Sequence, residues 1–264
     1  MNNNTTGKVW FVGAGPGDPE LLTLKGQGLI AKADAILFAG SLVSETAMRW
    51  AGPGCEIQDS KGMALEAITD WLIEKAKQNK TIVRLQTGDP GLYGALIEMV
   101  QPLDAAGIEI GVVPGVSSAM ASAAAGVESL TLPEVTQTVI FTRTEGRTPM
   151  PAGESLRELA QHQCTLCIFL SITLLKKVQA DLLAAGWHEN APILVVHKAS
   201  WPGEEKLIYG DISNIREKCR AEKINSQAMI IVSPAIGARR WPTLKKSRLY
   251  AKDFTHRFRR ADKK

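Results

Sequence analysis

Short apolar runs alternate with segments of helical periodicity along the first half of the chain. Residues 9–12 are β-branched or aromatic and too few for a helix, so they predict a buried strand. The same pattern recurs downstream and indicates an α/β arrangement. The predicted strands are 9–12, 35–39, 81–85 and 108–113, and the predicted helices are 21–32, 45–50, 63–78, one that begins near Leu92, and 119–125.

The periodicity resets at residues 126–133, which predicts a domain junction there. The second half has a different order of strands and helices, and this order predicts a mixed sheet. We therefore expect two α/β domains, residues 8–128 and 129–238, followed by an extension at 239–264. In the second domain the predicted strands are 138–142, 165–170, 193–197, 206–209 and 228–232, and the predicted helices are one that ends near His162, 174–185 and 211–219.

Three of the predicted strands end in a turn that contains both Gly and Pro. The first turn, residues 13–19, contains Gly13, Gly15 and Gly17, and it leads into Asp18-Pro19-Glu20, an N-cap followed by a proline and an early acid. The other two turns begin at Gly88 and Pro114. Ligands of open α/β sheets bind at such strand ends, and a helix N-terminus there favours an anionic group. A ligand site is therefore predicted where the three turns converge.

The glycine pattern restricts which ligand this site binds. A dinucleotide fingerprint needs a third glycine where this chain has Asp18, and no Gly-Lys-Ser/Thr occurs to form a phosphate loop. None of the three turns contains Lys or Arg, which disfavours a phosphate-rich cofactor. Backbone N–H and C=O groups suit an adenosine or an amino-acid group instead.

Charge is distributed unevenly along the 264 residues. The net charge is +4, but residues 239–264 carry eleven Lys and Arg against two Asp, so the preceding residues are net acidic. Such an extension attracts RNA or anionic lipid at low salt, or it is a solvated tail, and we favour the tail. Because the chain has no long apolar run and begins with polar residues, we predict no membrane span and a cytoplasmic location.

The four cysteines include one C-x-x-C pair, Cys164 and Cys167. This pair runs into an apolar segment that predicts a strand, and no second pair completes a zinc site. No helix start is present to activate a thiol. We expect buried structural cysteines and assign no metal site.

Three segments resemble, in order and spacing, the signatures of the S-adenosylmethionine-dependent tetrapyrrole methyltransferases. They are residues 12–19, 88–94 and 113–118, and the resemblance covers about residues 8–238. It implies two α/β domains with the cofactor S-adenosylmethionine between them, a homodimer, and a topology unrelated to Rossmann methyltransferases. The extension beyond Arg239 has no counterpart in this resemblance.

A second set of segments resembles the members of this family that act on corrin precursors (precorrins). Residues 39–43 and 142–149 are the strongest of these, and 132–135 and 198–202 support them. The activity implied is methylation of C-11 of precorrin-4 or its cobalt complex. Another tetrapyrrole acceptor, such as uroporphyrinogen-III, stays open as an alternative. A ribosomal-RNA substrate is the more distant one, because the acidic body argues against nucleic acid.

The resemblance also implies which residues bind the cofactor and the precorrin substrate. Leu170 falls where relatives often have Met, which keeps an apolar contact. Arg143 and Arg147 are expected to clamp substrate carboxylates, unless Glu145 neutralises one of them in a solvated loop. The residues expected at the cofactor are Pro16, Gly88, Asp89, Pro90, Tyr93, Ser117, Ser118, Leu170 and Ala199.

The sequence identifies no catalytic base. Methyl transfer from a sulfonium depends largely on positioning, so no catalytic triad is required. Glu134 is a candidate to accept the proton that the ring loses, and His197 is more simply read as a structural histidine. Asp89 is read either as a helix cap or as a polar group that faces the reaction centre, and the cap is favoured.

Overall fold

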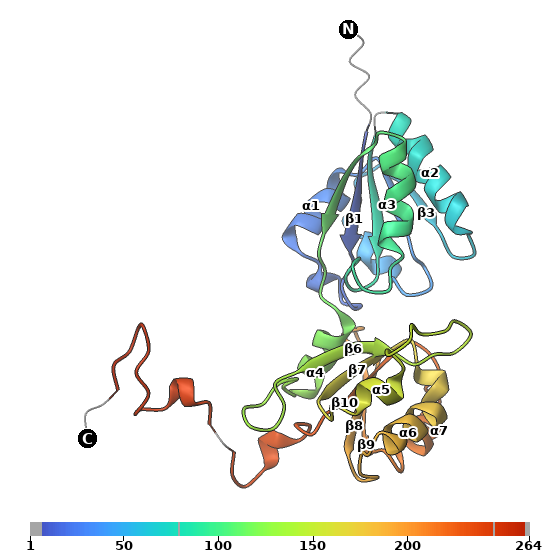
Figure 1. The fold of residues 1–264 in the computed structure, drawn as a ribbon. Helices are drawn as coiled ribbons and strands as arrows, with labels where there is room; N and C mark the ends of the chain where they lie inside the picture. The colour runs from blue at the N-terminus through green and yellow to red at the C-terminus, as the bar shows by residue number, and fades with distance from the viewer. Residues whose placement is uncertain (1–6, 79, 245, 262–264) are drawn as a thin grey trace. The chain divides into compact units, whose positions relative to one another are not determined.

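The chain folds into two compact α/β units in a computed structural model that describes residues 7–78, 80–244 and 246–261 (Figure 1). The first unit contains the described residues up to Ala121 and also Lys198–Glu205. The second contains Ser122–His197 and the described residues from Lys206 onward. The sequence predicted two α/β domains, and the two sheets with their helices confirm this fold class.

The first unit is built on a five-stranded sheet in which every neighbouring pair is parallel. The strand that contains Val12 is aligned with a neighbour on each side: Val12 lies opposite Leu85 on one neighbouring strand and opposite Val113 on the other. Parallel strands that are covered on both faces are apolar throughout, and this explains the short apolar runs. In spatial order the strands are β3 (Glu56–Asp59), β2 (Ala35–Phe38), β4 (Thr81–Gln86), β1 (Lys8–Gly13) and β5 (Glu109–Val113).

Helices cover both faces of this sheet because successive side chains of a strand point to opposite sides. Val12 and Val83 pack in a core with residues of α1 (Leu24–Lys32). Phe11 and Ile82 pack in a second core with residues of α2 (Leu65–Lys77) and α3 (Leu96–Ala105). Short 3₁₀ turns η1 (Pro19–Leu21) and η2 (Glu45–Met48) and the helix α4 (Ser118–Gly126) complete the first half of the chain.

The second unit contains the predicted mixed sheet. Its strands β6 and β7 pair in parallel, whereas the other neighbouring pairs are antiparallel. An apolar core that includes Ile168, Leu182 and Ile230 joins the sheet to its helices. In spatial order the strands are β6 (Val139–Arg143), β7 (Thr165–Phe169), β10 (Ala228–Val232), β8 (Pro192–His197) and β9 (Lys206–Asp211), and the helices are α5 (Leu156–Ala160), η3 (Ile172–Leu174), α6 (Leu175–Ala184) and α7 (Ile215–Ala221).

Three helix starts and one strand differ from the sequence prediction, and one of these helices, expected from Asp211, begins at Ile215. The helix expected near Leu92 begins at Leu96, because Tyr93 and Ala95 adopt left-handed backbone conformations. The first helix begins at Leu24 with Thr23 as its N-cap, while Asp18 caps only the preceding 3₁₀ turn. The strand β3 was missed because its Glu-Ile-Gln-Asp sequence lies largely exposed at the sheet edge.

The basic extension contains local structure of its own. It includes η4 (Ala238–Arg240) and η5 (Arg248–Tyr250). The guanidinium of Arg259 donates to the carbonyl oxygens of Leu249 and Ala251, at 2.9 and 2.6 Å, and so contacts the C-terminal part of η5. In the parts of the chain described, no helix is long and apolar enough to cross a membrane.

Candidate functional site

Backbone hydrogen bonds join the loops at the carboxyl edge of the first sheet. The Gly88 amide donates to the Gly15 carbonyl at 2.8 Å, and the Gly15 amide donates back to Gly88 at 3.3 Å. The Ala14 amide also donates to the Gln86 carbonyl, at 2.7 Å. The loops after β1 and β4 therefore form one continuous backbone surface, and the convergence predicted from the sequence is confirmed for these loops.

The third loop, after β5, approaches the other two so closely that only glycine fits. A Cβ on Gly13 would lie 2.5 Å from the Gly88 carbonyl oxygen and 2.6 Å from the Gly115 Cα. Real Cβ atoms do not approach other atoms this closely, so a side chain would push the loops apart. Gly88 also has φ +60°, which side chains rarely tolerate. The three glycines are therefore required by the geometry of this edge.

The carboxylate of Asp89 ties two of these loops together. Its Oδ1 accepts from the Gly91 amide at 2.8 Å and its Oδ2 accepts from the Gly115 amide at 3.0 Å. The favoured interpretation of Asp89 as a helix cap is wrong, because α3 begins seven residues later with Ala95 as its N-cap. Both carboxylate oxygens of Asp89 are therefore engaged within the loops.

Ser117 starts the helix that follows the third loop. Its Oγ accepts from the Ala119 amide at 3.3 Å, and α4 begins at Ser118. Capping of this helix by Ser117 or Ser118 was predicted from the sequence, and the structure assigns it to Ser117.

A fourth segment, Lys198–Glu205, packs on the first loop although it follows β8 in sequence. The Ser200 Oγ accepts from the Asp18 amide at 3.0 Å, and the Trp201 indole Nε1 donates to the Pro16 carbonyl at 3.1 Å. Ala199, a predicted cofactor residue, is buried in this segment. Sequence reasoning missed Ser200 and Trp201, because their contacts join positions more than 180 residues apart.

Strained backbone conformations also occur in these loops. Tyr93, Lys198 and Ser200 all have positive φ, between +48° and +65°. Such conformations cost about 1–3 kcal/mol each and persist where the surroundings fix them, most often at ligand sites. Tyr93, another predicted cofactor residue, is half exposed at the end of its loop.

Gln86 presents an unsatisfied acceptor at the end of β4. Its Nε2 donates to the Gly94 carbonyl, but its buried Oε1 has no hydrogen-bond partner among the described residues. A buried amide oxygen without a donor costs about 1–3 kcal/mol unless a ligand or water supplies one. This oxygen is therefore available to accept a hydrogen bond from a ligand or from a water molecule.

A buried arginine supports the neighbouring loop, residues 39–43. Arg84 Nη1 donates to the Ser60 Oγ at 2.9 Å, and Ser60 donates to the Phe38 carbonyl at 3.0 Å. Burial lowers the pKa of Arg84 to about 10, although the nearby Asp59 carboxylate opposes this shift. Asp59 also accepts from the Gly40 amide at 2.9 Å. This polar network holds the first residues of the loop in place.

The remaining predicted residues lie in the second unit. Leu170 follows β7 with φ +53° and is 63% exposed, so its side chain is available to a ligand. Arg143 ends β6, and its guanidinium donates to the carbonyls of Thr148 and Pro149 at 3.2 and 2.8 Å. Arg147 is exposed on the same loop. Glu145 pairs with Lys177 at 3.3 Å, so it does not neutralise an arginine as the alternative interpretation required.

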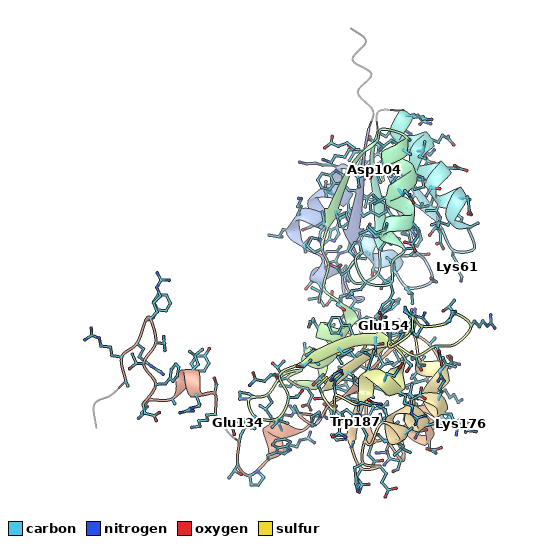
Figure 2. All side chains as sticks on the ribbon, viewed as in Figure 1. Lys61, Asp104, Glu134, Glu154, Lys176 and Trp187 are labelled. Atoms are coloured by element: carbon cyan, nitrogen blue, oxygen red, sulfur yellow. The ribbon has the colours of Figure 1, made fainter. Side chains whose placement is uncertain are left out.

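The candidate base Glu134 lies on an exposed loop of the second unit, where Figure 2 labels it. Its φ is +60°, within a turn closed by the bridge between Leu132 and Thr136. That Glu134 accepts the proton lost by the ring stays a prediction.

Cys167 lies on β7, as the apolar pattern predicted, and Cys164 immediately precedes this strand. Cys164 and Cys167 are both buried free thiols, and burial raises the pKa of Cys167 to about 12. A thiol that stays protonated is neither a nucleophile nor a metal ligand at neutral pH. Among residues 7–78, 80–244 and 246–261, no three His, Cys, Asp or Glu side chains gather to hold a metal ion.

Comparisons with known proteins place this arrangement among characterised relatives. The family described as tetrapyrrole (corrin/porphyrin) methylases matches residues 8–216. The cobalt-precorrin-4 C(11)-methyltransferase of Methanocaldococcus jannaschii is 46% identical over 264 residues, which cover all of both chains.

Two solved structures share the fold. The X-ray structure of a cobalamin biosynthetic enzyme, cobalt precorrin-4 methyltransferase, matches with a TM-score of 0.84 and 44% identity, over 87% of this chain and 95% of that one. The uroporphyrin-III C-methyl transferase of Thermus thermophilus, complexed with S-adenosyl homocysteine, matches with a TM-score of 0.73 and 29% identity, over 88% of this chain and 100% of that one.

Proposed function

Because this chain belongs to the family of tetrapyrrole (corrin/porphyrin) methylases, we propose that it transfers a methyl group from S-adenosylmethionine to C-11 of precorrin-4 or its cobalt complex. The observation that carries this proposal is the 46% identity over the full length of both chains to a protein named for that reaction. The relative and the more similar of the two solved structures are both named for the cobalt form, which favours cobalt-precorrin-4. Cobalt then belongs to the substrate and needs no ligand from the protein.

The carboxyl edge of the first sheet fits S-adenosylmethionine. The unpartnered Gln86 Oε1 is an acceptor for an ammonium, amino or hydroxyl group of such a molecule. The three loops offer backbone groups and no lysine or arginine, which suits a cofactor without phosphates. When bound, the cofactor supplies an electrophilic methyl group on a sulfonium, whose leaving group needs no proton.

Residues of the first unit would bind and orient the cofactor. Asp89 holds the loops after β4 and β5 in register through its two amide contacts. Ser200 and Trp201 hold the first loop through Asp18 and Pro16. Fixed loops of this kind lower the entropic cost of aligning the reactants. The residues of this unit that we propose at the cofactor are Pro16, Gln86, Gly88, Asp89, Pro90, Tyr93, Ser117, Ser118 and Ala199. The role of Leu170, in the second unit, stays a sequence-based prediction.

Residues of the second unit would recognise the macrocycle. Precorrins carry several acetate and propionate carboxylates, and arginine binds carboxylates through two parallel hydrogen bonds. Arg147 is exposed and pairs with no carboxylate among the described residues. Arg143 already donates to two carbonyls of its own loop, so it shapes the loop as well as adding charge.

We also propose that the chain works as a homodimer in the cytoplasm. The dimer is supported by the family resemblance, and the location is the sequence-based expectation. Sedimentation equilibrium would test the first, since a monomer at micromolar concentration would contradict it. Cell fractionation would test the second.

An anaerobic turnover assay tests the proposed reaction. Purified protein and S-adenosylmethionine are incubated separately with cobalt-precorrin-4, precorrin-4 and uroporphyrinogen-III, and the product is analysed by mass spectrometry and NMR. A single new methyl at C-11 is expected with one or both precorrins. Methylation of uroporphyrinogen-III alone would move the assignment to another acceptor in the same family. Cofactor binding without methylation of any acceptor would overturn the substrate assignment.

A further inference from the structure

The loop that follows β6 carries two arginines and one glutamate within five residues. Arg143, Glu145 and Arg147 lie on residues 143–147, and Glu145 is two positions from each arginine. A carboxylate this close in sequence competes with any ligand carboxylate for the same guanidinium groups. The position of Glu145 therefore decides whether the loop binds an anion.

Helix α6 removes this competition through Lys177. The Lys177 Nζ lies 3.3 Å from Glu145 Oε1 and 3.0 Å from Asp181 Oδ2. It thus bridges the glutamate of the loop to an aspartate one helical turn further along its own helix. Its hydrogen bond to Asp181, opposed by partial desolvation and assisted by Glu145, raises the pKa of Lys177, so the ammonium stays charged near neutral pH.

Thr144 anchors the start of the same loop to other residues of the second unit. This buried residue donates its amide to the Ser171 Oγ at 2.9 Å, and its hydroxyl lies 3.5 Å from Asp181 Oδ2. Ser171 in turn donates to the Phe169 carbonyl at the end of β7. The anchored backbone and the ion pair together hold Glu145 toward α6.

We propose that Lys177 is a positioning residue for substrate binding: it holds Glu145 on α6 and so keeps Arg143 and Arg147 available for carboxylates of the macrocycle. This inference rests on the proposed function, because it assumes a polycarboxylate substrate. It adds to that function a residue, Lys177, that takes no direct part in methyl transfer. Lys177 acts through the charge of its neighbour rather than through contact with the substrate.

Four variants separate this role from a general effect of charge or folding. Lys177→Met releases Glu145, and Lys177→Arg preserves the cation. Lys177→Met combined with Glu145→Gln removes both the cation and the competing carboxylate. Lys176→Met is the matched control, because Lys176 is the exposed neighbour on the same helix and makes no ion pair among the described residues (labelled in Figure 2).

The primary measurement is the dissociation constant of cobalt-precorrin-4, obtained by anaerobic absorbance titration with S-adenosyl homocysteine present to prevent turnover. In Lys177→Met the freed Glu145 carboxylate lies near the arginines and should weaken substrate binding about five-fold. This is the size expected for one solvent-screened charge at short range. The KM should rise by the same factor while kcat and the affinity for S-adenosyl homocysteine stay unchanged. Lys177→Arg, Lys176→Met and the double variant should bind like the wild type.

The outcomes distinguish this inference from the proposed function. Wild-type turnover with unchanged substrate affinity in Lys177→Met would overturn the inference and leave the function standing. If the double variant binds as weakly as Lys177→Met, the cation itself and not the release of Glu145 is responsible, which also overturns it. If the wild type binds cobalt-precorrin-4 without methylating it, the proposed function fails while the titration still tests Lys177. Absence of any wild-type binding would overturn both.

Comparing melting temperature with substrate affinity separates the proposed positioning role of Lys177 from a purely structural one. Among the described side chains, loss of Lys177 leaves the largely buried carboxylate of Asp181 with only its contact to Thr144, and the double variant does not restore the lost partner. Both variants should therefore melt at similarly lowered temperatures, although only the single variant binds substrate weakly. Affinity that instead follows melting temperature across the four variants would contradict the inference.

Discussion

The indole Nε1 of Trp201 donates a 3.1 Å hydrogen bond to the carbonyl oxygen of Pro16. Its ring also lies against Gly17, at a distance that leaves no space for a side chain there. The Lys198–Glu205 segment is thereby joined to the first glycine loop, although 185 positions separate Trp201 from Pro16. The shape of that loop depends on a residue that no local pattern connects with it.

We predict that Gly17→Ala weakens cofactor binding at least about ten-fold. The added methyl group would overlap the Trp201 ring, and overpacking of this kind costs about 1–3 kcal/mol. To relieve the overlap the indole must move, and its hydrogen bond to Pro16 is lost. Isothermal titration with S-adenosyl homocysteine measures the change in affinity.

Gly28→Ala is the matched control for this substitution. Gly28 lies exposed within α1, and a Cβ there would meet nothing within 4 Å. Because alanine favours the helix over glycine by about 0.5–1 kcal/mol, this variant should be slightly more stable and bind the cofactor normally. Equal affinity in the two variants would show that the contact between Gly17 and Trp201 does not shape the site.

The bridging role of Asp89 predicts the effect of an isosteric change. Asp89→Asn replaces one carboxylate oxygen by an amide group, which cannot accept from the Gly91 or Gly115 amide. We expect a loss of about 2 kcal/mol in unfolding free energy, because hydrogen bonds to charged groups contribute about 1.5–3 kcal/mol. Affinity for S-adenosyl homocysteine should fall about ten-fold, as the loops after β4 and β5 separate.

Asp34→Asn provides the comparison. Asp34 accepts from the Thr81 amide at 2.7 Å through one oxygen, at the amino end of the sheet, and asparagine can replace that acceptor. Urea unfolding and calorimetric titration of both variants should therefore show a large effect for Asp89 and a small one for Asp34. Similar cofactor affinities in the two would argue against a bridging role for Asp89.

Most of the first unit could be predicted from local sequence because its strands are buried on both faces. Ala35–Phe38 is apolar and buried at every position, and such a run has few alternatives to a central strand. Glu56–Asp59 gives no such signal, because it lies at the sheet edge and is largely exposed. The turn after Asp89 resembled a helix start, but the left-handed backbone at Tyr93 and Ala95 delays the helix.

The candidate site was predictable only where its residues lie near one another in sequence or at equivalent strand ends. The glycine loops follow parallel strands, so their convergence follows from the sheet. The contacts of Ser200 with Asp18 and of Lys177 with Glu145 join separate parts of the chain. Residue types alone cannot choose among the many polar partners available for such contacts. Sequence reasoning therefore found the loops but not the residues that hold them.

The two arginines at the end of β6 and in the loop after it, Arg143 and Arg147, are predicted to differ in their effects. Arg147→Ala should raise the KM for cobalt-precorrin-4 about ten-fold without changing stability, because the exposed side chain forms no ion pair among the described residues. Arg143→Ala should raise KM and also lower the melting temperature, because it removes the donors to Thr148 and Pro149. Steady-state kinetics and thermal unfolding measure these quantities.

Arg147→Lys and Arg220→Ala are the controls for the arginine variants. Lysine keeps the charge but loses the paired donors of arginine, so KM should lie between the wild type and Arg147→Ala. Arg220 is an exposed arginine on α7, and its loss should leave KM unchanged. Substrate affinity unaffected by combined Arg143→Ala and Arg147→Ala would exclude these residues as carboxylate anchors.

The buried thiols predict a loss of stability in mild alkali. Burial raises the pKa of Cys167 to about 12 and that of Cys219 to about 11, from an ordinary value of 9.0. Below pH 9 the thiols stay protonated in both the folded and the unfolded protein. Above pH 9 they lose their protons in the unfolded chain while they stay protonated in the folded protein. Each thiol should therefore lower the unfolding free energy by about 1 kcal/mol between pH 9 and pH 10.

Cys167→Ala isolates one of these contributions. The variant should lose about 1 kcal/mol less than the wild type between pH 9 and pH 10, measured by urea unfolding. Ile168→Val, its neighbour on β7, also trims a buried side chain but should keep the wild-type pH dependence. The comparison ends at pH 10, because Arg84 has a pKa lowered to about 10 and its loss of a proton in the folded state acts in the opposite direction. Equal pH dependence in the wild type and Cys167→Ala would mean that this thiol is exposed to solvent or ionises normally in the folded protein.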